Sequence, residues 1–207
     1  MPLFPGRRSA WIGPVVLACF VSNSAAVDLD VTDSRIGAAL AIARSSEAER
    51  AAFHKPYVMT TSAPLVENIE IITEFRRMVK IAEAKIAAGD PFFARNTRAA
   101  ENAIRPFHHR LSIVAKLRFH PQNLFVVSPP IDVSLLDQFV PVPRLDIQNQ
   151  TLFGFGTGKA EQQLPVAGAT SEAVFDATVV GQSYRTIVVR VEEKDVVRHT
   201  IDLGRLE

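Results

Sequence analysis

The spacing of apolar residues changes once along this chain, near Arg110, and this change constrains the fold more than any other feature. Before Arg110, apolar residues recur every three or four positions, which predicts amphipathic helices. After it, Leu111, Ile113 and Leu117 alternate with polar or charged residues, which predicts a strand with one buried face. Helices followed by strands indicate an α+β fold, with N-terminal helices packed on a C-terminal antiparallel β-sandwich of about seven strands.

The longest predicted helix covers residues 64–88. Its apolar stripe includes Phe75 and Val79, and its polar face includes Glu67, Glu70 and Glu74. We expect the stripe to pack against the sheet and to hold the two regions together. Shorter helices are expected over residues 33–43, 46–54 and 97–104. The expected strands cover residues 110–119, 124–127, 131–135, 145–153, 172–180, 186–191 and 196–203.

The N-terminus has the pattern of an export signal. Arg7 and Arg8 precede an apolar run over residues 11–21, and small residues follow as far as Ala26. The run is shorter than the roughly 20 residues that a transmembrane helix needs. We therefore expect a signal peptide over residues 1–26, a helical region over 27–107 and a β-sandwich over 108–207. The mature chain is expected to have no transmembrane helix and to lie in the periplasm or outside the cell.

Cys19 offers a second processing route. Residues 16–19 have the pattern of a lipoprotein box, in which the cysteine is lipidated and becomes the first residue. In this alternative, a lipid anchors the protein to the bacterial envelope. Because Cys19 is the only cysteine, neither route leaves a pair of thiols for a disulfide.

No catalytic or metal-binding motif stands out in the sequence. The five histidines have no H-x-H or H-E-x-x-H spacing and no evident acidic cluster beside them, and no G-x-S-x-G is present. His108 and His120 are expected roughly 40 Å apart, at opposite ends of one strand. We expect each histidine to be a surface or loop residue, and we expect no metal, no cofactor and no catalytic residue.

Phenylalanines gather in the sequence where the helices give way to the strands. They can pack the helices on the sandwich or line a ligand cleft, and packing is the favoured interpretation because aromatic residues dominate ordinary cores. The residues concerned are Phe92, Phe93, Phe107, Phe119 and Phe125.

The segment from residue 95 to residue 120 is strongly basic. It holds six cations and a single acid, Glu101, although the whole chain has 23 basic and 22 acidic residues. Arg110, Lys116 and Arg118 should share the exposed face of one strand. This face could bind an anionic partner, such as a lipid headgroup, a glycan or an acidic protein surface.

Alternatively, acids on other strands neutralise this basic face. The sequence favours that interpretation, with Asp132, Asp137 and Asp176 as the neutralising acids, because charges segregated in a sequence often cancel in space.

These observations favour a non-catalytic binding or interaction protein exported to a bacterial envelope. The near-neutral overall charge argues against nucleic acid as the partner. The basic strand face of Arg110, Lys116 and Arg118 is the candidate binding surface. Two alternatives stay open: a periplasmic hydrolase with a site assembled from distant loops, and an envelope lipoprotein anchored through Cys19.

Overall fold

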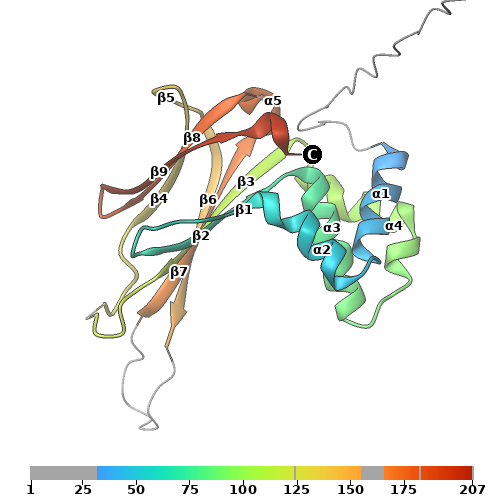
Figure 1. The fold of residues 1–207 in the computed structure, drawn as a ribbon, viewed down its shortest axis with the longest axis horizontal. Coiled ribbons are helices and arrows are strands. Elements are labelled where there is room, and N and C mark those ends of the chain that lie inside the picture. The colour runs from blue at the N-terminus through green and yellow to red at the C-terminus, as the bar shows by residue number, and fades with distance from the viewer. Residues whose placement is uncertain (1–31, 124, 155–165, 182, 207) are drawn as a thin grey trace, which may run out of the picture.

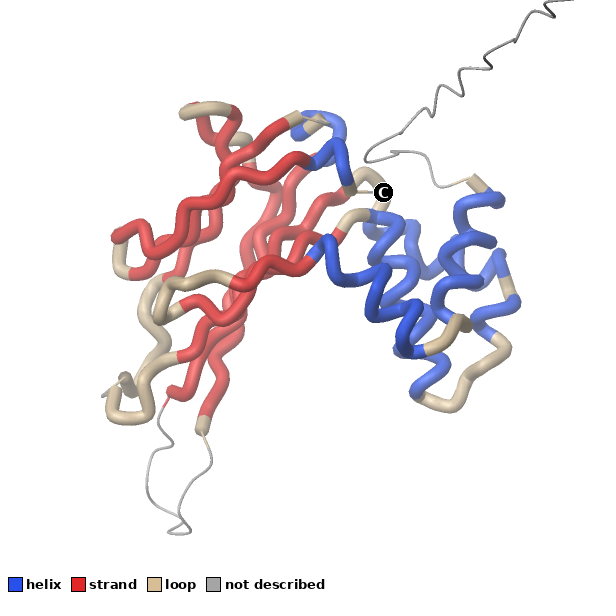
Figure 2. Tube along the Cα trace, viewed as in Figure 1, coloured by secondary structure: helices blue, strands red, loops and turns tan. Residues whose placement is uncertain are grey.

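The helices and the strands of this chain form two adjoining bodies in the computed structural model (Figure 1). Residues 32–123, 125–154, 166–181 and 183–206 are described. The expected signal peptide over residues 1–26 and the lipidation candidate Cys19 lie outside them. Figure 2 shows most of the helical segments on one side and the strands on the other, with short helical segments also at one end of the strands. An α+β fold with two antiparallel sheets is therefore confirmed.

Four helices form the first body: α1 (Asp33–Ala43), α2 (Glu47–His54), α3 (Glu74–Ala87) and α4 (Thr97–Ile104). Each begins after a residue whose side chain accepts a backbone N–H of the first turn, as N-caps do. These caps are Thr32, Ser46, Thr73 and Asn96. No helix in the described part of the chain is long and apolar enough to cross a membrane.

A five-stranded antiparallel sheet adjoins the helices. Its order is β1-β2-β3-β7-β6, with β3 in the centre. The strands are β1 (Val58–Thr60), β2 (Val66–Ile72), β3 (Arg110–Arg118), β7 (Val166–Asp176) and β6 (Arg144–Phe153). Ile113 of β3 lies opposite Ile71 of β2 and Ala173 of β7, which fixes the register of the centre of the sheet.

A second, four-stranded sheet completes the sandwich. Its order is β5-β4-β8-β9, formed by β5 (Val140–Pro141), β4 (Ile131–Asp137), β8 (Tyr184–Val191) and β9 (Lys194–Asp202). The hairpin between β8 and β9 turns at Glu192 and Glu193, both with positive φ, as tight hairpins require. A short helix, α5 (Ala177–Val180), links β7 to β8.

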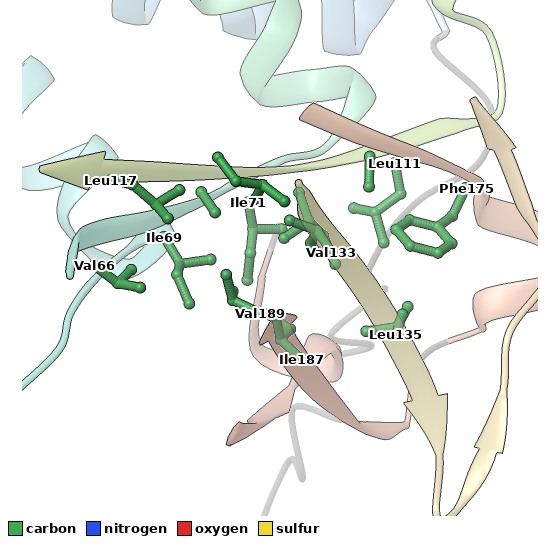
Figure 3. Packing of buried hydrophobic residues seen from close by; sticks show 14 of the residues in the cluster. Val66, Ile69, Ile71, Leu111, Leu117, Val133, Leu135, Phe175, Ile187 and Val189 are labelled. Atoms are coloured by element: carbon green, nitrogen blue, oxygen red, sulfur yellow. The ribbon is translucent and has the colours of Figure 1, made fainter. Parts of the chain in front are cut away.

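The described residues form two hydrophobic cores. The sandwich core lies between the two sheets and includes Ile71, Val133 and Phe175 (Figure 3). The helical core lies among α1, α3 and α4. Phe53 of α2 packs at the margin of both cores. Each body therefore buries its own apolar residues. Apart from Phe53, the two bodies are joined by contacts that lie outside the two cores.

The expected helix over residues 64–88 is wrong in its first half. Residues 66–72 form β2, and α3 begins only after Thr73. Leu65, Ile69 and Ile72 happen to follow helical spacing, but pairing with β3 places this segment in the sheet. Glu67 and Glu70 therefore lie on a strand, not on the helix face they were expected to share with Glu74.

The expected packing of the helix stripe on the sheet is also wrong. Phe75 and Val79 are buried in the helical core, not against a strand. The boundary at residues 107/108 stays a prediction, although β1 and β2 come from the chain before it. Two further strand expectations fail. Residues 125–127 form no strand, and residues 177–180 form α5 instead of extending β7.

The phenylalanines of the junction do not form one cluster. Phe119 and Phe125 meet edge to face, with ring centroids 5.3 Å apart, at the sandwich core. Phe93 and Phe107 belong to the helical core instead. Phe92 is 77% exposed and belongs to neither core. Four of the five are thus packed in one core or the other, but the expectation that they pack the helices on the sandwich is wrong, because each lies within the core of a single body.

Candidate functional site

Polar side chains at the start of α3 join the helices to the outer face of the five-stranded sheet. On β3, the odd-numbered residues from Leu111 to Leu117 enter the sandwich core, so the even-numbered ones face outward. Ser112 is one of these outward residues, yet it is fully buried. Its cover is Arg77 of α3, which donates a hydrogen bond to its hydroxyl and pairs with Glu172 of β7 at 3.0 Å. The side chain of Arg77 therefore links α3 to the outer faces of β3 and β7.

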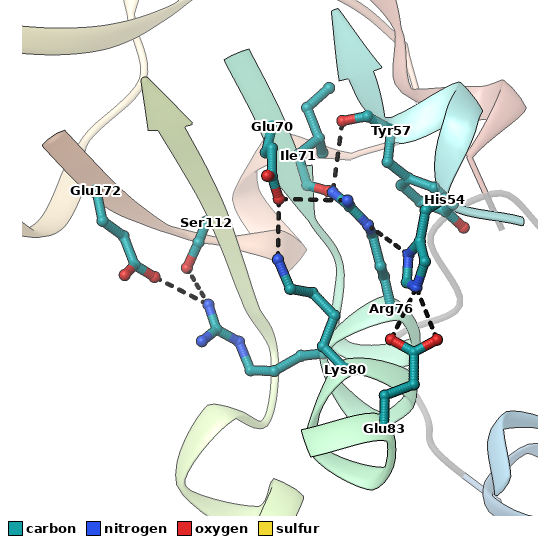
Figure 4. A network of polar contacts seen from close by, with 10 residues as sticks. His54, Tyr57, Glu70, Ile71, Arg76, Lys80, Glu83, Ser112 and Glu172 are labelled. Carbon is teal, nitrogen blue, oxygen red and sulfur yellow. Dashed lines mark hydrogen bonds and ion pairs between the residues drawn. The ribbon is translucent and has the colours of Figure 1, made fainter. Parts of the chain in front are cut away.

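Arg76 is the centre of the largest polar network at this junction (Figure 4). Its side chain is only 3% exposed. The guanidinium donates to the backbone oxygens of Ile71 and Tyr57 and pairs with Glu70 at 3.3 Å. Its Nε donates to Nδ1 of His54 at 3.3 Å. Arg76 thus ties α2, α3 and β2 together.

The network places a histidine between a cation and an acid. Nε2 of His54 lies 3.0 Å from Glu83, which also pairs with Arg50 at 3.4 Å. A guanidinium N–H can only donate, so Nδ1 of His54 accepts from Arg76 and the ring proton is assigned to Nε2. His54, Arg50 and Glu83 line a surface pocket of about 480 Å³.

Burial and the neighbouring charges shift the pKa values of Glu70 and Arg76. Burial raises the pKa of Glu70, but the hydrogen bond and charge of Lys80 and the charge of Arg76 outweigh it and lower the pKa below 4.5. Burial lowers the pKa of Arg76 below its ordinary value, against the opposing effect of Glu70. Lys80 reaches the Glu70 carboxylate at 2.9 Å. Glu70 is therefore held as a carboxylate between two cations.

A second cluster, Glu74, His108 and His109, lies at the other edge of the junction. Glu74 is the first residue of α3 and its side chain is 5% exposed. One carboxylate oxygen lies 2.9 Å from Nδ1 of His108, and the other accepts the backbone N–H of His109 at 2.9 Å. The rings of His108 and His109 are 3.8 Å apart. One ligand atom from each of the three side chains lies within 4.8 Å of the others.

Two sequence expectations about histidines are corrected by these clusters. His54 is a partly buried residue of α2 rather than a surface or loop residue, whereas His108 and His109 lie in the turn before β3 as expected, and His54 and His108 each contact a carboxylate. The acids are distant in the sequence, so no local motif could reveal them. The available signals were the adjacent pair His108–His109 and an acid after the N-cap Thr73. In the described part of the chain, the ring hydrogen bonds of His54 and His108 go to Glu83, Arg76 and Glu74, so neither histidine forms a Ser–His pair.

The predicted basic face lies on β3, but the side chain of Arg77 covers Ser112 within it. Arg110, Lys116 and Arg118 are all exposed. Arg110 lies at the start of β3, before the buried Ser112, whereas Lys116 and Arg118 lie at its far end. β3 has nine residues, so Arg110 and Arg118 are roughly 26 Å apart. Lys116 pairs with Glu67 at 3.2 Å, whereas Arg110 and Arg118 have no ion pair within the described residues.

The acids expected to neutralise this face are engaged elsewhere. Asp132 pairs with Arg144 and Arg190, and Asp137 pairs with Arg185. The carboxylate of Asp176 accepts hydrogen bonds from the backbone and hydroxyl of Thr178, which lower its pKa. The interpretation favoured from the sequence is therefore wrong for Asp132 and Asp137, whereas Asp176 lies opposite Arg110 across the β3–β7 pair but forms no ion pair with it among the described residues. Two of the three predicted binding cations are left without an acidic partner in the described structure.

No protein-family model, no curated protein and no solved structure matches this chain. The site is therefore defined by its geometry alone.

Proposed function

We propose that this protein is a non-catalytic binding protein, exported to the envelope of a bacterium, whose partner carries an acidic protein segment. The observation that carries this proposal is the exposure of Arg110 and Arg118 without an ion pair among the described residues. An arginine that is exposed and unpaired keeps its donors free for a carboxylate of another molecule. The signal pattern over residues 1–26 supports export.

The position of α3 favours a protein segment over a flat anionic surface. The side chain of Arg77, which comes from α3, covers Ser112 on β3 between Arg110 and Arg118. The outer face between the two arginines is thus tied to the helical body, which hinders a flat bilayer from contacting both. An extended segment of about eight residues spans roughly 26 Å and can follow the strand past the helix. Acidic residues at the two ends of such a segment would meet the two arginines.

The proposal is tested with a fluorescent glutamate-rich peptide and the double variant Arg110→Glu/Arg118→Glu. This variant leaves the ion pair of Lys116 and Glu67 intact. The matched control is Lys55→Glu/Lys194→Glu, which changes the net charge equally at two exposed lysines that have no ion pair among the described residues. We expect the double variant to raise the Kd by at least about tenfold, and the control to change it little.

Three outcomes contradict the proposal. Equal loss of binding in the variant and the control would show that only net charge matters. Unchanged binding in the double variant would remove the two arginines from the site. Binding to vesicles of phosphatidylglycerol, without binding to the peptide, would replace the acidic segment by a lipid surface.

A further inference from the structure

We propose that Glu74, His108 and His109 form a binding site for a divalent transition-metal ion, with Zn²⁺ as the representative ion. Two imidazoles and one carboxylate are a ligand set that such ions use, and three protein ligands leave a coordination position open. This inference is independent of the acidic partner proposed above, because it uses neither Arg110 nor Arg118.

The backbone at His109 is the first argument for a built site. Successive residues of an extended chain point to opposite faces. His109 has a φ of 55°, in the left-handed region, and this breaks the alternation at the start of β3. As a result, the rings of His108 and His109 lie side by side, with centroids 3.8 Å apart and planes tilted by 39°, instead of pointing apart. A left-handed residue other than glycine costs about 1–2 kcal/mol, and such strain gathers at functional positions.

The state of the ligand atoms is the second argument. Nδ1 of His109 is buried and has no hydrogen-bond partner within the described structure. An unpaired buried ring nitrogen is unfavourable, and a metal ion would satisfy it. Glu74 is 5% exposed, and its first-turn position on α3 favours a carboxylate there. The backbone N–H of His109 holds one oxygen of that carboxylate in place.

The distances allow a metal ion after a small adjustment. With metal–ligand bonds of about 2.0–2.1 Å, ligand atoms of a tetrahedral site lie about 3.3 Å apart. Nδ1 of His108 and the nearer oxygen of Glu74 are 2.9 Å apart, and the three ligand atoms lie within 4.8 Å. The metal would take the place of the proton between Nδ1 of His108 and Glu74, and His108 would bind it as the neutral ring that carries its proton on Nε2.

The surroundings leave room for the open coordination position. Glu74 and His108 line a surface pocket of about 240 Å³, together with Ile36, Ile104, Glu101 and Arg105. Arg105 is paired with Glu101 at 3.6 Å, so its charge is partly balanced within the pocket. Water or a small anion could therefore occupy the remaining position on the metal.

Calorimetric titration of the metal-free full chain with ZnCl₂ tests the site. The Cys19→Ser background prevents the lone thiol from contributing. We expect one Zn²⁺ per chain and a rise in the unfolding temperature with added Zn²⁺. Loss of an outer-shell partner costs about 10–100-fold in affinity, so His108→Ala, which removes a ligand, should cost at least about 100-fold. The side chain of His108 is 48% exposed, so this variant should fold.

His109→Ala and Glu74→Gln should give the same loss, whereas the control His199→Ala, at an exposed position on β9, should bind as the parent does. Should Glu74→Gln fail to fold, His108→Ala and His109→Ala decide the result. Zn²⁺ binding that both histidine variants retain, or no stoichiometric binding by the parent chain, overturns the proposal. Loss in His199→Ala equal to that in His108→Ala would also overturn it, because it would show surface binding.

Discussion

Replacing Arg76 with methionine should lower the free energy of unfolding by about 3–5 kcal/mol, the cost of breaking a buried charged network on one side. Methionine retains much of the length and apolar volume of arginine but none of its donors. The backbone oxygens of Ile71 and Tyr57 would lose a donor, and each unsatisfied buried group costs about 1–3 kcal/mol. Glu70 would retain Lys80 as its only cation in this network.

Equilibrium unfolding in urea, followed by circular dichroism, measures this change. For a chain of this size, about 2–4 °C of unfolding temperature accompanies each kcal/mol, so the melting temperature should fall by roughly 6–20 °C. Arg198→Met is the matched control, because Arg198 is half exposed and Asp195 retains Arg190 as a second partner. It should cost no more than about 1 kcal/mol. Equal, small losses in both variants would refute the role of Arg76 in joining the two bodies.

Three further predictions concern acid stability, the helical core and processing. The folded-state pKa of Glu70 lies below its ordinary 4.5, so the contribution of Glu70 to stability is present above about pH 4.5 and is lost as the pH falls through the folded-state value. Urea unfolding at a series of pH values measures the resulting fall in the free energy of unfolding, and Glu70→Gln should remove the part of this fall that Glu70 causes. An equal fall in the parent and in Glu70→Gln would contradict the prediction. Phe75→Asp places a charge at a position that is 8% exposed and should abolish the cooperative melting curve. The control Phe92→Asp, at a position that is 77% exposed, should melt as the parent does. A parental melting curve for Phe75→Asp would refute the burial of Phe75 in the helical core. Mass spectrometry of the chain isolated from a bacterium should show a free N-terminus at Val27, or an acylated Cys19 if the lipoprotein route operates, and an intact Met1 would contradict both.

The alternation of apolar residues predicted the central strand of the larger sheet well. The pattern from Leu111 to Leu117 is unambiguous, and β3 occupies residues 110–118. The segment before α3 failed because its apolar residues fit two periods at once. Helical spacing joins Leu65, Ile69 and Ile72, but pairing with β3 selects the strand. That choice depends on a partner 40 or more positions away, which local spacing does not contain.

The polar junction was harder to predict than the fold. Nothing in the local pattern singles out Arg76 and Arg77, because charged residues of an amphipathic helix are usually solvated. Their partners lie on β2, β3 and β7, so only the three-dimensional arrangement identifies them. The cluster of Glu74, His108 and His109 was missed for the same reason. The basic residues of β3 were found from sequence because alternation along a single strand suffices to place them.

The salt dependence of peptide binding tests the central claim, a binding site for an acidic segment at Arg110 and Arg118, most directly. Interactions between exposed charges weaken as salt shortens the screening length from about 10 Å at 0.1 M to about 3 Å at 1 M. The Kd of the parent chain for the glutamate-rich peptide should therefore rise steeply over this range, and the slope should be much smaller for Arg110→Glu/Arg118→Glu. Parallel salt dependences for the parent and this variant would contradict the claim.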